Sequence, residues 1–168
     1  KSHPDNSEAA ELLRNMHQAM GNYKGALKAQ DLLDKANGST DVYSAMQRFQ
    51  IYREIGNTKK GLLVLEDYLK KEPSEHYVQV FLADTYMALG DSAEAHRRYE
   101  DIEKHYPENP YLPYSFSAFY SEQGDTAKAI DYLWRIIEND EMSAEYKLGI
   151  VNANACLQSN DSVLQKAY

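Results

Sequence analysis

Apolar residues recur at helical spacing along the chain. Within 58–72, Leu62, Leu65 and Leu69 follow one another at intervals of three and four positions, which is the spacing of one face of an α-helix. The same spacing predicts an all-α fold built from helix pairs. We expect first helices near 6–20, 41–55, 75–89, 110–123 and 143–158, and second helices near 22–37, 58–72, 92–106, 126–139 and from 161 onward.

Three glycines mark the turns inside these pairs. Gly56, Gly90 and Gly124 stand at equal intervals along the sequence, a tyrosine stands four positions before each one, and Asn or Asp follows directly. This composition is typical of a helix end, a tight turn and the N-cap of the next helix. Self-similarity at a fixed period predicts a repeat array. Its copies cover approximately 7–41, 42–75, 76–109 and 110–143, and a partial copy covers 144–168.

The third copy has the fullest set of repeated residues: Leu82, Ala83, Tyr86, Gly90, Ala95, Tyr99 and Pro107. This pattern resembles the tetratricopeptide repeat (TPR), and the resemblance covers nearly the whole chain. It implies a single domain over 1–168, a right-handed α-solenoid of stacked antiparallel helix pairs with about four full repeats and a partial fifth. Phe49 and Gly61 depart from the pattern, because a small residue and an alanine are expected there. We expect these departures to change packing detail more than fold.

In this family the first helices line the concave face, so the resemblance implies that they contact partners. The expected first helices carry far fewer charged side chains than the expected second helices. Tyrosines recur at one equivalent position of successive first helices. The expected partner-binding residues are Tyr43, Met46, Gln50, Tyr77, Phe81, Asp84, Tyr111 and Tyr114. The alternative is that these tyrosines pack between successive helices, as Tyr52, Tyr86 and Tyr120 are expected to do.

These features favour a protein-interaction scaffold that binds a peptide, helix or loop of a partner protein. The alternative is a sensor or regulatory domain of a longer bacterial protein, for which the cell envelope is one candidate location. The net charge of −8 and the pI near 5.1 argue against nucleic acid, which needs clustered Lys and Arg. No apolar stretch is long enough for direct membrane insertion. Self-association through exposed repeat ends is also expected, and the compartment, cytoplasmic or periplasmic, stays open.

No residue pattern indicates catalysis, a cofactor or a metal site. His96 and His105 lie on a charged second helix without the spacing of zinc ligands, and we expect both to be solvated. Cys156 has no assignable base and is expected to be a core residue. Some TPR proteins grip a partner's terminal carboxylate with Lys and Asn on first helices. Met46 and Gln50 stand at those positions in the second copy, so that clamp is not expected here.

Overall fold

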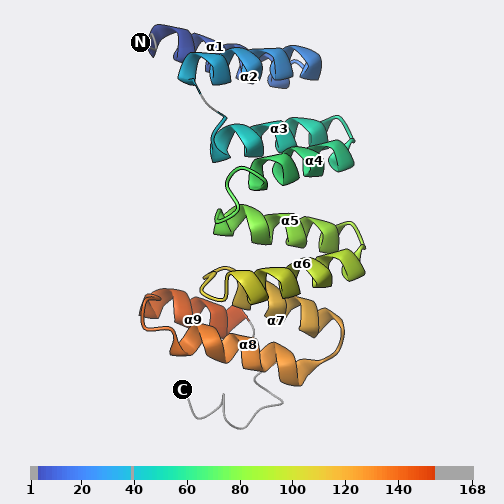
Figure 1. The fold of residues 1–168 in the computed structure, drawn as a ribbon, viewed down its shortest axis with the longest axis vertical. Helices are drawn as coiled ribbons and strands as arrows, with labels where there is room; N and C mark the ends of the chain where they lie inside the picture. The colour runs from blue at the N-terminus through green and yellow to red at the C-terminus, as the bar shows by residue number, and fades with distance from the viewer. Residues whose placement is uncertain (1–3, 39, 154–168) are drawn as a thin grey trace. The chain divides into compact units, whose positions relative to one another are not determined.

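The computed structural model of the chain describes residues 4–38 and 40–153. Within these ranges it contains nine α-helices and no strand (Figure 1). They are α1 (Pro4–Ala19), α2 (Tyr23–Asn37), α3 (Val42–Glu54), α4 (Thr58–Leu69), α5 (His76–Ala88), α6 (Ser92–His105), α7 (Leu112–Glu122), α8 (Thr126–Glu138) and α9 (Ala144–Ala153). The all-α class is confirmed, and the helix ends that fall on described residues lie within a few residues of those expected; the end expected at 158 lies outside them. Cys156 and the helix expected from 161 lie outside the described residues.

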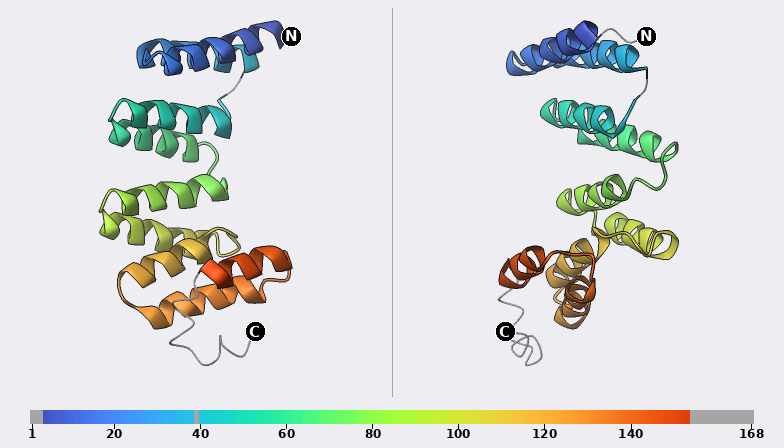
Figure 2. Two further views of the ribbon diagram at one scale, coloured as in Figure 1. Left: turned by 180° about the vertical axis from the view of Figure 1, so that it is seen from behind. Right: turned by 90° about the vertical axis from the view of Figure 1, so that its left-hand side faces the viewer.

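Two compact units divide the chain, Lys1–Val78 and Gln79–Tyr168, with the boundary inside α5. In the first unit α1 packs against α2, α3 packs against α4, and α2 contacts α3. In the second unit α7 packs against α8, α6 contacts α7, and α8 contacts α9 (Figure 2). Paired helices in each unit are therefore neighbours in sequence joined by short turns. A single solenoid domain over 1–168 stays a prediction.

The repeated glycines close the turns between paired helices as the sequence predicts. Gly21, Gly56, Gly90 and Gly124 have φ between +69° and +82°, a left-handed conformation that side chains other than hydrogen disfavour. After Gly56, the backbone N–H of Asn57 donates to the carbonyl of Tyr52 at 2.9 Å. The Asn57 side chain then accepts from the N–H of Lys60 at 3.2 Å. This short segment thus supplies hydrogen-bond partners for backbone groups at the end of α3 and at the start of α4.

Small residues allow close approach within each pair. Ala26, Ala95 and Ala129 are all fully buried. At the equivalent place in α4, a Cβ on Gly61 would lie 2.9 Å from Cδ2 of Phe49, which is closer than real Cβ contacts. The two departures from the TPR pattern therefore compensate one another, because the missing methyl group of Gly61 makes room for the ring of Phe49.

The recurrent tyrosines four positions before the turn glycines are half-buried. Each lies beneath a cation from the following helix: Lys60 over Tyr52 at 5.2 Å, Arg98 over Tyr86 at 4.7 Å, and Lys128 over Tyr120 at 4.7 Å from the ring centroid. These contacts have cation–π geometry. In the second unit, Tyr86 and Tyr120 also pack against the buried cluster around Tyr99 and Phe116.

His96 is only partly solvated, in contrast to the expected solvated side chain, since 35% of the side chain is exposed. Its ring stacks on Phe119 with centroids 5.0 Å apart and planes inclined by 16°. The His96 Nε2 atom also lies 3.3 Å from the hydroxyl of Tyr120. Helix α6 contacts α7, and this contact brings the His96 ring onto aromatic side chains of α7 that its own helix does not supply.

Candidate partner-binding surface

Four of the eight expected contact residues lie in the first unit. The ring of Tyr43 is 46% exposed, yet its hydroxyl donates to Glu11 Oε1 at 3.0 Å and accepts from Arg14 Nη2 at 3.0 Å. The Arg14 guanidinium also lies 5.4 Å from the centre of the Tyr43 ring. Tyr43 therefore joins α3 to α1 through its hydroxyl while its ring remains open to solvent.

The other three residues in this unit differ in exposure. Tyr77, at the start of α5, is 44% exposed. Met46 and Gln50 on α3 are half-buried, and the Gln50 amide donates to Glu54 Oε1 at 3.1 Å. Only the two tyrosines of this group therefore offer large exposed side chains.

The second unit contains a pocket of about 430 Å³ on its first-helix surface. Helices α5, α6 and α7 contribute its lining: Asp84, Met87, Ala88, Tyr99, Tyr114, Ser115, Ala118 and Glu122. Two of the expected contact residues, Asp84 and Tyr114, thus meet at one concavity. Phe81 is half-buried outside this lining, whereas Tyr111 is exposed one helical turn before Tyr114.

The carboxylate of Asp84 is held by two neutral donors. The Tyr99 hydroxyl donates to Oδ1 at 2.6 Å, and the Ser115 hydroxyl donates to Oδ2 at 3.1 Å. Loss of hydration raises the pKa of Asp84, and the two hydrogen bonds only partly oppose this effect. Asp84 is still exposed on the pocket side, so the carboxylate is closely surrounded by protein without being sealed from solvent. Burial and the adjacent carboxylate raise the pKa of Tyr99, which keeps its proton and remains a donor.

A buried amide pair fixes the segment that leads into α7. Asn109 is 2% exposed, and its Nδ2 donates to Gln79 Oε1 at 3.0 Å. Its Oδ1 accepts from the backbone N–H of Tyr111 at 3.0 Å. The pair therefore positions the start of α7, and with it Tyr111 and Tyr114. This role was hard to foresee, since an Asn before Pro110 is typical of an exposed turn.

A second polar arrangement, in the first unit, was not anticipated from the sequence. Arg14 is 2% exposed, and its Nη1 donates to Gln30 Oε1 at 2.9 Å. The Gln30 amide donates to Asp34 Oδ1 at 2.7 Å and to Ser44 Oγ at 3.2 Å. These residues connect α1, α2 and α3. Arg14 occupies the position at which the third copy has the small Ala83, and a charged residue at a usually buried position was the available signal.

Arg48 completes this network at its more exposed edge. Its Nη2 lies 2.7 Å from Asp34 Oδ2 and 2.8 Å from Asp31 Oδ1. Burial alone would raise the pKa of Asp34, but hydrogen bonds from Arg48, Ser44 and Gln30 outweigh it and hold this pKa below its ordinary value. The network is therefore a set of satisfied polar contacts that joins the first two helix pairs.

Comparison with solved structures supports the repeat assignment. A crystal structure of MamA protein matches over 80% of this chain and 73% of its own, with 15% identity and a TM-score of 0.54. A P212121 crystal structure of MamA AMB-1 matches over 98% of this chain and 87% of its own, with 18% identity and a TM-score of 0.54. MamA has a TPR-like helical-repeat structure. The chain has the tetratricopeptide-repeat fold. No family model matches the sequence, and no curated protein matches it.

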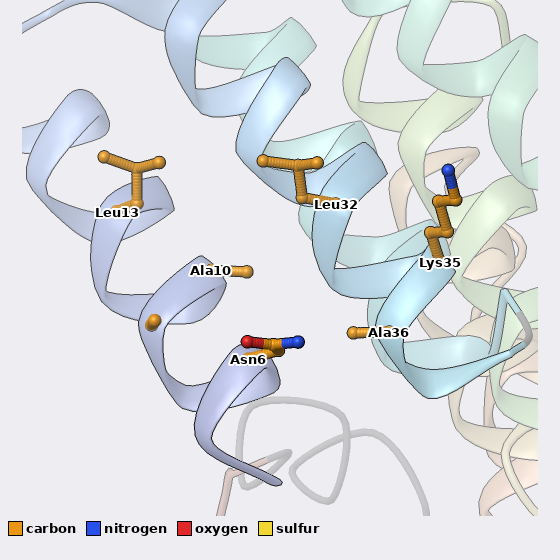
Figure 3. A pocket seen from close by; sticks show the side chains of 7 residues that line it. Asn6, Ala10, Leu13, Leu32, Lys35 and Ala36 are labelled. Atoms are coloured by element: carbon orange, nitrogen blue, oxygen red, sulfur yellow. The ribbon is translucent and has the colours of Figure 1, made fainter. Parts of the chain in front are cut away.

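The first TPR copy also has an apolar hollow, of about 460 Å³, on the α1–α2 pair. Figure 3 shows Leu13 and Ala10 extending from α1 and Leu32 and Ala36 from α2. Leu13 and Leu32 are 40% and 55% exposed, whereas Leu82, at the position of Leu13 in the third copy, is 1% exposed. The α1–α2 pair therefore exposes a leucine at a repeat position that is buried in the third copy.

The described part of the chain offers little for other kinds of site. Residues 4–38 and 40–153 hold no group of three or more His, Cys, Asp or Glu side chains arranged to bind a metal ion. None of their helices combines the length and hydrophobicity that crossing a membrane requires. The α5–α7 pocket and the exposed tyrosines are thus the strongest candidates for a functional surface.

Proposed function

We propose that this protein is a non-catalytic interaction scaffold that binds a peptide, helix or loop of a partner protein on its first-helix surfaces. The contact residues are Tyr43, Met46, Gln50, Tyr77, Phe81, Asp84, Tyr111 and Tyr114. The observation that carries the proposal is the α5–α7 pocket, where the fixed carboxylate of Asp84 and the exposed ring of Tyr114 line one concavity. Apolar walls with a few fixed polar groups are typical of binding sites.

The exposed tyrosines support this proposal. Tyr111 and Tyr114 are 47% and 42% exposed; Tyr111 is the N-cap residue of α7 and Tyr114 lies in its first turn. Tyrosine is enriched among residues that dominate binding energy, partly because fixing its few torsions costs little entropy. Tyr114 lines the pocket and offers a point of anchorage, and Tyr111 adds exposed aromatic area three positions earlier in the sequence.

The test is partner capture from a lysate of the source organism, with prey identified by mass spectrometry. The wild-type chain is compared with a Tyr111→Ala/Tyr114→Ala variant and with Tyr146→Ala. Tyr146 is a matched control because it is 45% exposed in the same unit but outside the expected contact set. Equal helical circular dichroism and equal unfolding midpoints must first show that all three chains fold alike.

We expect a saturable prey that the double variant loses and that the Tyr146→Ala control retains. A Tyr43→Ala/Tyr77→Ala variant measures the contribution of the first unit in the same assay. Retention of every specific prey by both double variants would contradict the proposed surface.

A further inference from the structure

The wall of the α5–α7 pocket carries negative charge and no positive charge. Helix α5 contains Asp84 as its only carboxylate and α7 contains Glu122 as its only carboxylate, and neither helix contains Lys or Arg. Both carboxylate side chains line the pocket, and none of the other lining residues is charged. The pocket is therefore an acidic concavity, with its charge placed by two neighbouring first helices.

Asp84 accepts hydrogen bonds from neutral groups alone, in contrast to the ion-paired carboxylates of the neighbouring helix α6. Glu94 pairs with Arg97 at 2.6 Å, and Glu103 pairs with Arg135 at 2.6 Å. Asp84 instead accepts from the Tyr99 and Ser115 hydroxyls, which fix its orientation without neutralising it. Each carboxylate oxygen has a second acceptor direction, so a cation is able to add to this arrangement without displacing a donor.

The rest of the lining suits the stem of a long cationic side chain. Met87, Ala88 and Ala118 offer apolar contact, which the methylene groups of Lys and Arg use when their charged ends find polar partners. Tyr114 adds an exposed aromatic ring, on whose face a cation is attracted. The raised pKa of Asp84 agrees with a carboxylate that has lost hydration and gained no cation, a state that a bound cation would relieve.

We therefore propose that the α5–α7 pocket holds the cationic side chain of an arginine or lysine from the partner peptide, with Asp84 as its fixed acceptor and Glu122 as a second carboxylate. The proposal rests on the proposed function and specifies its partner: a peptide with a basic anchor residue. Charge complementarity and apolar contact for the stem select this occupant over an acidic or purely apolar residue.

The direct test uses N-acetyl-arginine amide and N-acetyl-lysine amide as probes, with N-acetyl-citrulline amide as the neutral counterpart of arginine. Citrulline retains the length and planar end group of arginine but lacks its charge. Each probe is titrated into the isotope-labelled full chain while NMR follows the amide signals of Met87, Ser115 and Ala118. We expect saturable shifts of these signals with at least one cationic probe and only weak, unsaturated shifts with citrulline.

Two matched variants separate the pocket from the overall negative charge. Asp84→Asn is expected to weaken binding of the cationic probe by about tenfold, which corresponds to about 1.4 kcal/mol. Asp101→Asn makes the same change in net charge on an exposed part of α6 outside the pocket lining, and its affinity should stay within about twofold of wild type. Glu122→Gln, at an exposed residue, is a second pocket variant that does not remove the acceptor of Tyr99, and it should weaken binding in the same direction.

Equal binding of citrulline and arginine, or equal weakening by Asp84→Asn and Asp101→Asn, would overturn the basic-anchor proposal. Its failure is distinguishable from failure of the scaffold proposal. Capture that depends on Tyr111 and Tyr114 but is unchanged by Asp84→Asn would retain the scaffold and reject the basic anchor. Saturable probe binding without any tyrosine-dependent capture would retain the cation site and reject the proposed partner surface.

Discussion

The contact between Gly61 and Phe49 predicts that the effect of Gly61→Ala on stability changes sign when the Phe49 ring is removed. An alanine Cβ at position 61 would lie 2.9 Å from Cδ2 and 3.1 Å from the carbonyl oxygen of Phe49. Phe49 is 2% exposed, so its ring has little room to withdraw. Overpacking of this kind costs about 1–3 kcal/mol, whereas replacing a helical glycine by alanine gains about 1 kcal/mol. Gly61→Ala alone should therefore destabilise the protein by up to about 2 kcal/mol.

Removal of the ring should reverse this effect. Phe49→Ala alone should cost about 3–5 kcal/mol because it opens a cavity. In that background the Cδ2 contact is gone, and the remaining backbone contacts, 3.1 Å to the carbonyl oxygen and 3.3 Å to Cα of residue 49, need shifts of only a few tenths of an ångström. Gly61→Ala should then stabilise the protein by about 1 kcal/mol through helix propensity. The coupling between the two positions should be about 1–3 kcal/mol.

Urea unfolding followed by helical circular dichroism measures this cycle, with m-values checked for equality because repeat proteins can depart from two-state unfolding. Phe49→Leu provides a milder background if Phe49→Ala leaves too little folded protein. Gly25→Ala is the control, since its Cβ would meet only the side-chain tips of His17 and Asn22, and its effect should be near neutral. If Gly61→Ala costs the same with and without the ring, to within about 0.5 kcal/mol, the compensation argument is wrong.

Three further outcomes are expected. Arg14→Met should cost about 1–3 kcal/mol in urea unfolding, because it leaves the buried Gln30 oxygen without this donor, whereas exposed Arg97→Met should cost less than about 0.5 kcal/mol. The folded-state pKa of Asp34 is lowered, so its stabilisation is present above the unfolded pKa and lost as pH falls through the folded value. Asp34→Asn should therefore lower the unfolding midpoint at neutral pH, with a difference that narrows below about pH 4. The apolar α1–α2 face predicts concentration-dependent self-association in sedimentation experiments, which Leu32→Lys should weaken.

The helices and turns were predictable because local rules determine them. The regular spacing of Gly56, Gly90 and Gly124 located turns in which the structure has a positive φ at each glycine. The Asn or Asp after each glycine was expected at a helix start, and Asn57 caps α4 as expected. These features depend on residues within a few positions of one another, so a single copy contains the information and the repeats confirm it.

The contacts between helices were less predictable because they combine residues that are distant in sequence. The position of Arg14 in the repeat indicates burial but not its partners, which are Gln30 from α2 and Tyr43 from α3. His96 was assigned to solvent from its charged neighbours, although Phe119 of α7 stacks on its ring. Local composition describes the helix on which a side chain stands but not the helix that packs against it.

In the candidate site, too, the sequence predicted residues on one helix face but not their partners from other helices. Periodicity selected Asp84 and Tyr114 as members of the first-helix surface, and the structure places both in the lining of one pocket. Periodicity did not identify Tyr99 and Ser115, whose hydroxyls hold the Asp84 carboxylate from two other helices. Their role as a partner surface remains a prediction, but the geometry gives it a specific chemical test.

The distribution of ion pairs explains how one carboxylate can matter in a chain with net charge −8. Around the second helices of the second unit, acidic residues have basic neighbours one turn away, as in Glu94 with Arg97 and Asp125 with Lys128. Such pairs cancel much of their own field within a few ångströms, and salt screens the remainder. Asp84 has only neutral hydrogen-bond donors and reduced hydration, so its field is neither cancelled nor fully screened. A basic side chain entering the pocket should therefore respond to Asp84 far more than to the more numerous paired acidic residues outside.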